Sequence, residues 1–199
     1  MRINHCLAVL IAGTCLVGCD KSSSSPPSPT VASASASTET APASTALATA
    51  TSRLPFPGTE EGAKALLEGF LKSDADRKTM TSSLRPDAAD FDAIFTSDVV
   101  ANARAAYDEK WKEEPVVEAR EGQTELQMWK ATTEQLRDGS GDASEFPSGY
   151  KKIADKLKPG LTFYRFKFVK PGDKHGNAFD GLVFVNGHWV MVSKPYRYL

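Results

Sequence analysis

Acid–base or metal chemistry in this chain would fall to four polar residues between positions 173 and 188. Asp173, His175, Asp180 and His188 are of the types that serve as general bases or metal ligands. Lys174 stands between Asp173 and His175, and its positive charge disfavours a cation there, so the simpler interpretation of that stretch is a solvated loop. His188 and Asp180 are weak candidates for a general base, and either would need to face a pocket to act as one. No metal and no cofactor are predicted.

Nucleophilic chemistry finds even less support in the residue spacing. No serine stands in the Gly-x-Ser-x-Gly pattern that places a nucleophile on a sharp turn. Ser148 and Lys151 have Ser-x-x-Lys spacing, but the companion motifs of penicillin-binding enzymes are absent and Ser148 is placed to cap a helix. The chain has three cysteines, Cys6, Cys15 and Cys19, so no thiol follows position 19. Catalysis is therefore the less favoured hypothesis.

Aromatic residues on the predicted strands admit two interpretations. They could line a pocket for an apolar or carbohydrate ligand, which a few polar groups among them would orient. They could equally form the core, which is the commoner role of aromatic residues on strands. The candidates for pocket lining are Trp129, Tyr164, Phe184 and Trp189.

Charge is divided unevenly along the chain, whose total is −1. Residues 59–145 carry 11 Lys/Arg against 20 Asp/Glu, whereas residues 146–199 carry 10 against 3. Either the two regions attract each other within one fold, or the basic one meets an anionic polymer, headgroup or protein of the cell envelope. No nucleic-acid partner is predicted. The candidate basic face comprises Arg165, Lys167, Lys170, Lys174 and Arg197.

The first twenty residues have the pattern of an export signal. Arg2 is followed by an uncharged, largely apolar stretch from Cys6 to Val17, which is shorter than the roughly 20 residues that span a bilayer. The stretch ends in Leu16-Val17-Gly18-Cys19, and this ending resembles the lipobox of bacterial lipoproteins. The resemblance implies cleavage after residue 18 and lipid attachment, including a palmitate-type acyl chain, at Cys19. Asp20 leaves the choice between inner and outer membrane open.

The chain after Cys19 is rich in Ser, Ala, Thr and Pro up to about residue 54. Such a composition offers too little apolar surface to offset the entropy of ordering, so a disordered tether is expected. The sequence therefore predicts a signal peptide over 1–18, a lipidated Cys19 with its tether over 19–54, and one globular domain over 55–199. The domain would lie outside the cytosol on a membrane anchor.

The first half of the predicted domain has helical periodicity. Thr59 can cap a helix whose apolar residues recur at helical spacing from Ala63 to Leu71. Short helices are predicted around 80–84 and 88–95, and a longer one from a cap at Ser97 to Pro115. Residues 124–131 alternate as a strand would, and 150–157 form a compact helix face.

The last third of the chain is rich in strand signals. Residues 162–169 alternate aromatic and basic side chains, and Asn186-Gly187 between two apolar runs predicts a two-residue hairpin. That turn would pair Val185 with His188 and Phe184 with Trp189. Both faces of the hairpin are then apolar, so we expect helices to cover one side and a second element the other.

These elements predict an α+β domain, with N-terminal helices packed on a C-terminal antiparallel sheet. In element order it resembles the NTF2-like (cystatin-like α+β) superfamily, which includes enzymes, binding proteins and assembly modules. The function expected is that of an envelope lipoprotein whose domain binds a ligand or acts as a structural module. The alternative is a small pocket enzyme, hydrolase or isomerase-like, with His188 or Asp180 as base.

Overall fold

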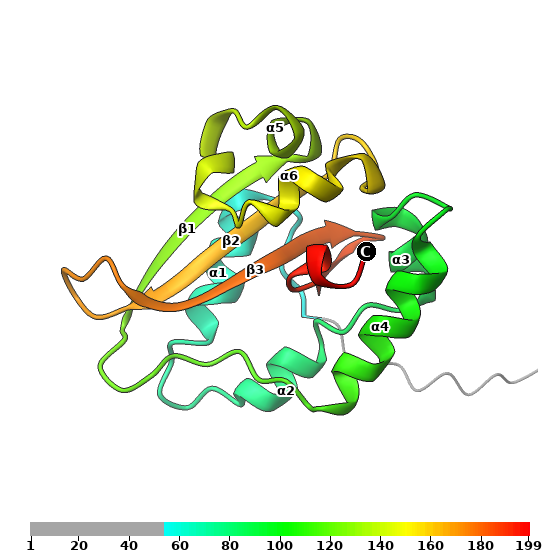
Figure 1. Cartoon of the computed structure of the whole chain (residues 1–199). Coiled ribbons are helices and arrows are strands. Elements are labelled where there is room, and N and C mark those ends of the chain that lie inside the picture. The colour runs from blue at the N-terminus through cyan, green and yellow to red at the C-terminus, as the bar shows by residue number, and fades with distance from the viewer. Residues whose placement is uncertain (1–53) are drawn as a thin grey trace, which may run out of the picture. The chain divides into compact units, whose positions relative to one another are not determined.

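A four-stranded antiparallel sheet organises the computed structural model, which describes residues 54–199. The strands follow one another in the order β1-β2-β3-β4 (Figure 1). Their bounds are Glu125–Thr132 for β1, Thr162–Val169 for β2, Gly176–Val185 for β3 and His188–Met191 for β4. The predicted signal peptide, Cys19 and the predicted tether up to residue 53 lie outside the described residues.

Helices precede the sheet and also interrupt it. Four come before β1: α1 (Glu60–Gly69), α2 (Arg77–Ser82), α3 (Ala88–Ile94) and α4 (Val100–Lys112). Two more, α5 (Thr133–Asp138) and α6 (Gly149–Ile153), lie between β1 and β2. The α+β class is as predicted, but the sheet is not purely C-terminal because β1 precedes two of the helices. No helix in residues 54–199 is long and apolar enough to cross a membrane.

Local capping fixes where the first helices begin. Thr59 caps α1 as predicted, and its Oγ1 accepts a hydrogen bond from the Gly62 amide at 3.1 Å. The predicted cap at Ser97 is wrong, because α4 begins at Val100. The turn before it is instead bound to a distant segment, since the Thr96 amide donates to the Lys156 carbonyl at 2.9 Å. A long-range contact thus moved the start of the helix.

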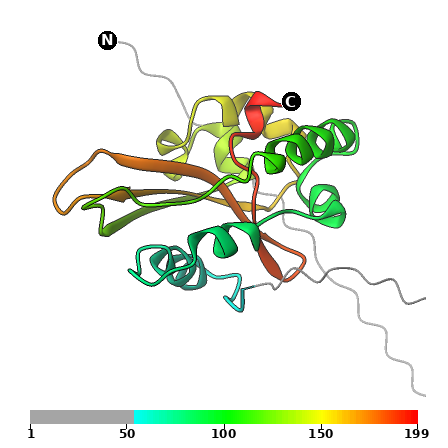
Figure 2. The ribbon, with the colours of Figure 1, turned by 90° about the horizontal axis from the view of Figure 1, so that it is seen from below.

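The C-terminal hairpin forms in the predicted register. Val185 pairs with His188 and Phe184 with Trp189, and both turn residues have positive φ, 49° at Asn186 and 79° at Gly187. All four residues of β4 are buried. Helices cover both faces of the sheet rather than one, with α1 on one side and α5 and α6 on the other (Figure 2).

A bulge in β3 changes which side chains point to each face. Arg165 pairs with Asp180 and Tyr164 with Leu182, so Gly181 is an extra residue in the ladder. Gly181 has φ of 85°, and a Cβ there would lie 2.0 Å from the Val192 carbonyl oxygen. Only glycine fits this position. The bulge helps to place the Asp180 side chain in the interior.

Strand β3 is paired unequally on its two sides. Along one edge it pairs with β2 from Gly176 to Val183, whereas along the other it pairs with β4 only from Leu182 to Val185. The first half of β3 therefore has no strand partner on its second edge within residues 54–199. That edge becomes one wall of a groove.

Candidate functional site

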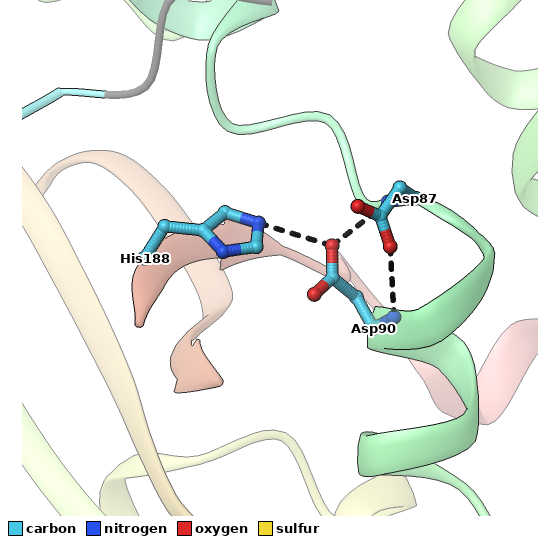
Figure 3. A group of neighbouring side chains, drawn as sticks. All are labelled: Asp87, Asp90 and His188. Atoms are coloured by element: carbon cyan, nitrogen blue, oxygen red, sulfur yellow. Dashed lines mark hydrogen bonds and ion pairs between the residues drawn. The ribbon is translucent and has the colours of Figure 1, made fainter. Parts of the chain in front are cut away.

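Asp90, on α3, is the buried centre of a polar cluster that joins α3 to the β3–β4 hairpin. Its Oδ2 lies 3.1 Å from Nε2 of His188 and accepts the Asp87 amide at 2.8 Å, while its Oδ1 accepts from the Asn186 side chain at 2.9 Å. Asp90 is 0 % and His188 4 % exposed. Figure 3 shows the carboxylate between the imidazole and the start of the helix. We call Asp87, Asp90, Asn186 and His188 the Asp90 cluster.

The Asp90 cluster contains a potential metal-ligand set. One ligand atom each from Asp87, Asp90 and His188 lie within 4.8 Å of one another. However, both Asp90 oxygens already accept hydrogen bonds, and Asp87 and Asp90 form the reciprocal capping box of α3, with the Asp90 amide donating to Asp87 Oδ1 at 3.1 Å. A metal ion would have to replace these bonds. The present geometry describes a structural latch between a helix and a hairpin.

Asp180, the other predicted candidate base, is also buried and hydrogen-bonded. It is 4 % exposed, and its Oδ1 accepts from the Tyr150 hydroxyl at 2.9 Å and from the Lys194 amide at 2.8 Å. Burial, and then the charge of Asp180, raise the pKa of Tyr150 well above its ordinary value of 10.0. The same two causes raise the pKa of Tyr107 well above that value. We call Asp180, Tyr150 and Lys194 the Asp180 cluster.

A groove of about 240 Å³ lies beside the Asp180 cluster, between α4 and the free edge of β3. Its apolar walls include Tyr107 and Trp111 of α4, Val116, Phe179 and Met191. Lys110 and Lys194 are the charged residues among those that line it, and no aspartate, glutamate or histidine is among them. We call it the α4–β3 groove.

The predicted basic residues lie on β2, in the loop that follows it and in the C-terminal turn. Arg165 and Lys167 lie half-buried on β2, and the Lys167 ammonium stands 4.8 Å from the centre of the Trp129 ring. Lys170 and Lys174 are exposed in the loop that joins β2 to β3, and Arg197 is exposed in the C-terminal turn. The sheet thus carries Arg165 and Lys167 on the face opposite Tyr164, Phe166 and Phe168.

The predicted pocket-lining aromatics do not line the α4–β3 groove. Tyr164 and Trp189 are buried against α1 with their rings 5.5 Å apart, and Phe184 packs against Trp189. Trp129 is half-buried on the other face of the sheet. His175 and Asp173 are exposed in the β2–β3 loop, whereas His188 and Asp180 are interior.

The sequence pointed to His188 and Asp180 but missed their partners. Asp90 is 98 positions from His188, and Tyr150 is 30 positions from Asp180. The Asp87-x-x-Asp90 spacing could have indicated a helix cap, but it carries no signal for the histidine contact. Lys194 was missed because nothing in the tail sequence marks its positive φ of 55°.

Comparisons with family models, curated proteins and solved structures return no match to this chain. The resemblances to bacterial lipoproteins and to the NTF2-like superfamily therefore stay predictions from the sequence.

Proposed function

We propose that this chain is a lipid-anchored lipoprotein of the bacterial cell envelope whose domain binds an anionic partner. Cys19 would hold the lipid, the segment after it would act as a spacer, and the domain would present its basic surface outside the cytosol. The lipobox resemblance supports the lipid anchor. A lipoprotein lipid has more than one acyl chain, and two or more acyl chains are needed for stable membrane binding. The second part depends on how the cations of the domain are paired.

The observation that carries the proposal is a difference in ion pairing between the two charged regions. In residues 59–145, eight of the 11 Lys/Arg side chains have a carboxylate within 4.0 Å. In residues 146–199, Lys156 is the only one of ten that does so within the described chain, through Asp98. The basic region is therefore left largely unneutralised, as a surface for an anionic partner would be.

Arg165 and Lys167 are the centre of this surface in the proposal. They lie on a sheet, which is a firmer support than a loop, and Trp129 beside them offers an aromatic ring for contact. Lys170 and Lys174 extend the positive charge along the same hairpin. A polymer with repeated phosphate or carboxylate groups matches an extended row of separate cations.

The alternative of a pocket enzyme requires a base that opens on a cavity. His188 and Asp180 are each 4 % exposed, and neither is among the residues that line the α4–β3 groove. Both are engaged in hydrogen bonds to other side chains or to the backbone. The geometry therefore favours binding over catalysis.

The proposal is tested by measuring the affinity of the full chain in detergent for long-chain polyphosphate. We expect Arg165→Gln/Lys167→Gln to weaken binding about tenfold at low salt, because two cations near the polymer are lost. The matched control is Lys151→Gln/Lys152→Gln, which removes two exposed charges of α6. Salt should weaken binding of the unaltered chain.

Equal losses of polyphosphate affinity in the two double variants would show that binding depends only on net charge. That result would contradict the assignment of the binding surface to Arg165 and Lys167. Binding to phosphatidylglycerol vesicles without binding to polyphosphate would replace the polymer by a membrane surface. Near-ultraviolet circular dichroism checks that each variant keeps its tertiary structure.

A further inference from the structure

One wall of the α4–β3 groove is an unpaired sheet edge. Asn177, Ala178 and Phe179 of β3 line the groove, and β4 pairs with β3 only from Leu182 onward. Residues 115–118 lie across the groove, and within residues 54–199 no backbone hydrogen bond joins them to these three residues. The side chain of Asn177 donates to the Glu118 carbonyl at 2.8 Å, which ties the end of the strand to that segment. A free edge of this kind is a template for an added strand.

The dimensions and walls of the groove suit an extended segment of chain. Its volume, about 240 Å³, is below the roughly 300–1,000 Å³ of typical small-molecule sites, but accommodates a few side chains. Tyr107, Trp111 and Met191 provide apolar surface inside it. Val116, on its rim, is 39 % exposed and is the one exposed large hydrophobic residue of the described chain. An extended peptide could place alternate apolar side chains there.

Lys194 supplies a cation at this groove. Its backbone is held in the left-handed region, with φ of 55° and ψ of 49°, where a non-glycine residue is uncommon. Its amide is fixed by the buried carboxylate of Asp180. No hydrogen bond or ion pair of its ammonium group is present within residues 54–199. Lys110, the other lysine of the groove, is by contrast paired with Glu113.

We propose that the α4–β3 groove binds an extended peptide segment of a partner protein, which adds to the free edge of β3 and pairs a carboxylate with Lys194. Charge complementarity selects the partner: the groove has two lysines and no acidic residue among those that line it. Asp180 is a positioning residue for Lys194. This site is separate from the Arg165 and Lys167 face of the sheet, so either proposal can fail without the other.

The experiment follows amide hydrogen exchange in the full chain in detergent. The probe is an acetylated peptide, Thr-Val-Thr-Val-Thr-Glu with an amidated end, and its matched control carries Gln in place of Glu. We expect the Glu peptide to slow exchange in the fragment that contains residues 177–179, because an added strand would engage amides of that edge. The Gln peptide should bind at least about tenfold more weakly, since a charge-assisted bond is lost.

Two variants separate the site from a general effect of charge. Lys194→Gln should remove the preference for the Glu peptide, whereas Lys151→Gln, on exposed α6, should leave it unchanged. Val116→Asp should weaken the binding of both peptides, because it places a negative charge on the apolar rim. Near-ultraviolet circular dichroism and the peptide affinity of Lys194→Arg, which should be retained, guard against misfolding.

Three results would overturn the proposal. The first is the absence of peptide-dependent protection at residues 177–179. The second is protection without peptide that disappears when residues 20–53 are deleted, because the occupant would then be the chain's own segment. The third is protection that rises with protein concentration alone, because the occupant would then be a second copy of this chain.

Discussion

The two buried aspartates of residues 54–199, Asp90 on α3 and Asp180 on β3, resemble each other in burial and differ in the groups that they bind. Asp90 accepts hydrogen bonds only from groups that are themselves parts of the latch between α3 and the hairpin. Asp180 accepts one bond from the interior Tyr150 and one from the backbone of Lys194, which lines the groove. A buried carboxylate can therefore join two elements of the fold, as Asp90 does, or position a residue of a neighbouring groove, as Asp180 does.

The largest effect is expected from Asp90→Ala. The substitution leaves the buried His188 ring and the side-chain amide of Asn186 without their acceptor, and removes half of the α3 capping box. We expect the free energy of unfolding to fall by about 3–5 kcal/mol, measured by urea denaturation. The control is Asp92→Ala on the same helix, where an exposed pair with Arg104 is lost and the change should stay below about 1 kcal/mol. Similar losses in both variants would refute the latch.

A smaller effect is expected from Asp180→Asn. The amide oxygen can still accept both bonds but carries no charge, and its NH2 group adds a donor to the interior, so the loss should be about 1–3 kcal/mol in the free energy of unfolding. Nuclear magnetic resonance should show a shift of the Lys194 amide, whose donor bond to Asp180 weakens. An unchanged Lys194 amide signal would contradict the role of Asp180 as a support for the groove.

The Asp180 cluster also predicts a loss of stability in alkali. Burial raises the pKa of Tyr150 in the folded state above 10.0, so the folded protein holds this proton more tightly than the unfolded chain does. The stabilisation is complete below pH 10 and is lost as the pH rises above that value. Tyr150→Phe should reduce this loss above pH 10, and should cost about 1 kcal/mol at neutral pH. Identical alkaline unfolding curves for Tyr150→Phe and the unaltered chain would contradict the contribution of the Tyr150 hydroxyl to this loss of stability.

The smallest effect on stability is expected from Lys194→Gly. Glycine adopts the positive φ of this position without strain, while it raises the entropy of the unfolded chain. The two effects oppose each other, so the free energy of unfolding should change by less than about 1 kcal/mol. Thermal denaturation measures it. A large loss would show that the Lys194 side chain, and not only its backbone, stabilises the fold.

The sequence was most informative where local chemistry decides the structure. Asn186-Gly187 specifies its turn, and the turn specifies the register of Val185 with His188. Thr59 specifies the start of α1 by its own hydroxyl. Ser97 failed as a cap because Thr96 is bound to Lys156, a contact between segments far apart in the chain.

The candidate sites depend on contacts that a local pattern cannot contain. The side-chain partners of His188 and Asp180 come from α3 and α6, and the second donor to Asp180 is the backbone of Lys194. The bulge at Gly181 depends on the pairing of β3 with β2 and on the approach of the Val192 carbonyl. The α4–β3 groove needs β4 to end before it covers the first half of β3. In contrast, the unequal charge of the two regions was plain in the sequence. The structure added that nine of the ten Lys/Arg residues in 146–199 have no ion-pair partner among residues 54–199.

We propose that Cys19 fastens this domain to a membrane, and metabolic labelling with palmitate is the measurement that can confirm or refute this anchor. The chain and its Cys19→Ala variant are expressed in bacterial cells, and the label is followed in each purified product. We predict label in the unaltered chain and none in the variant. Equal labelling of the two proteins would contradict the anchor.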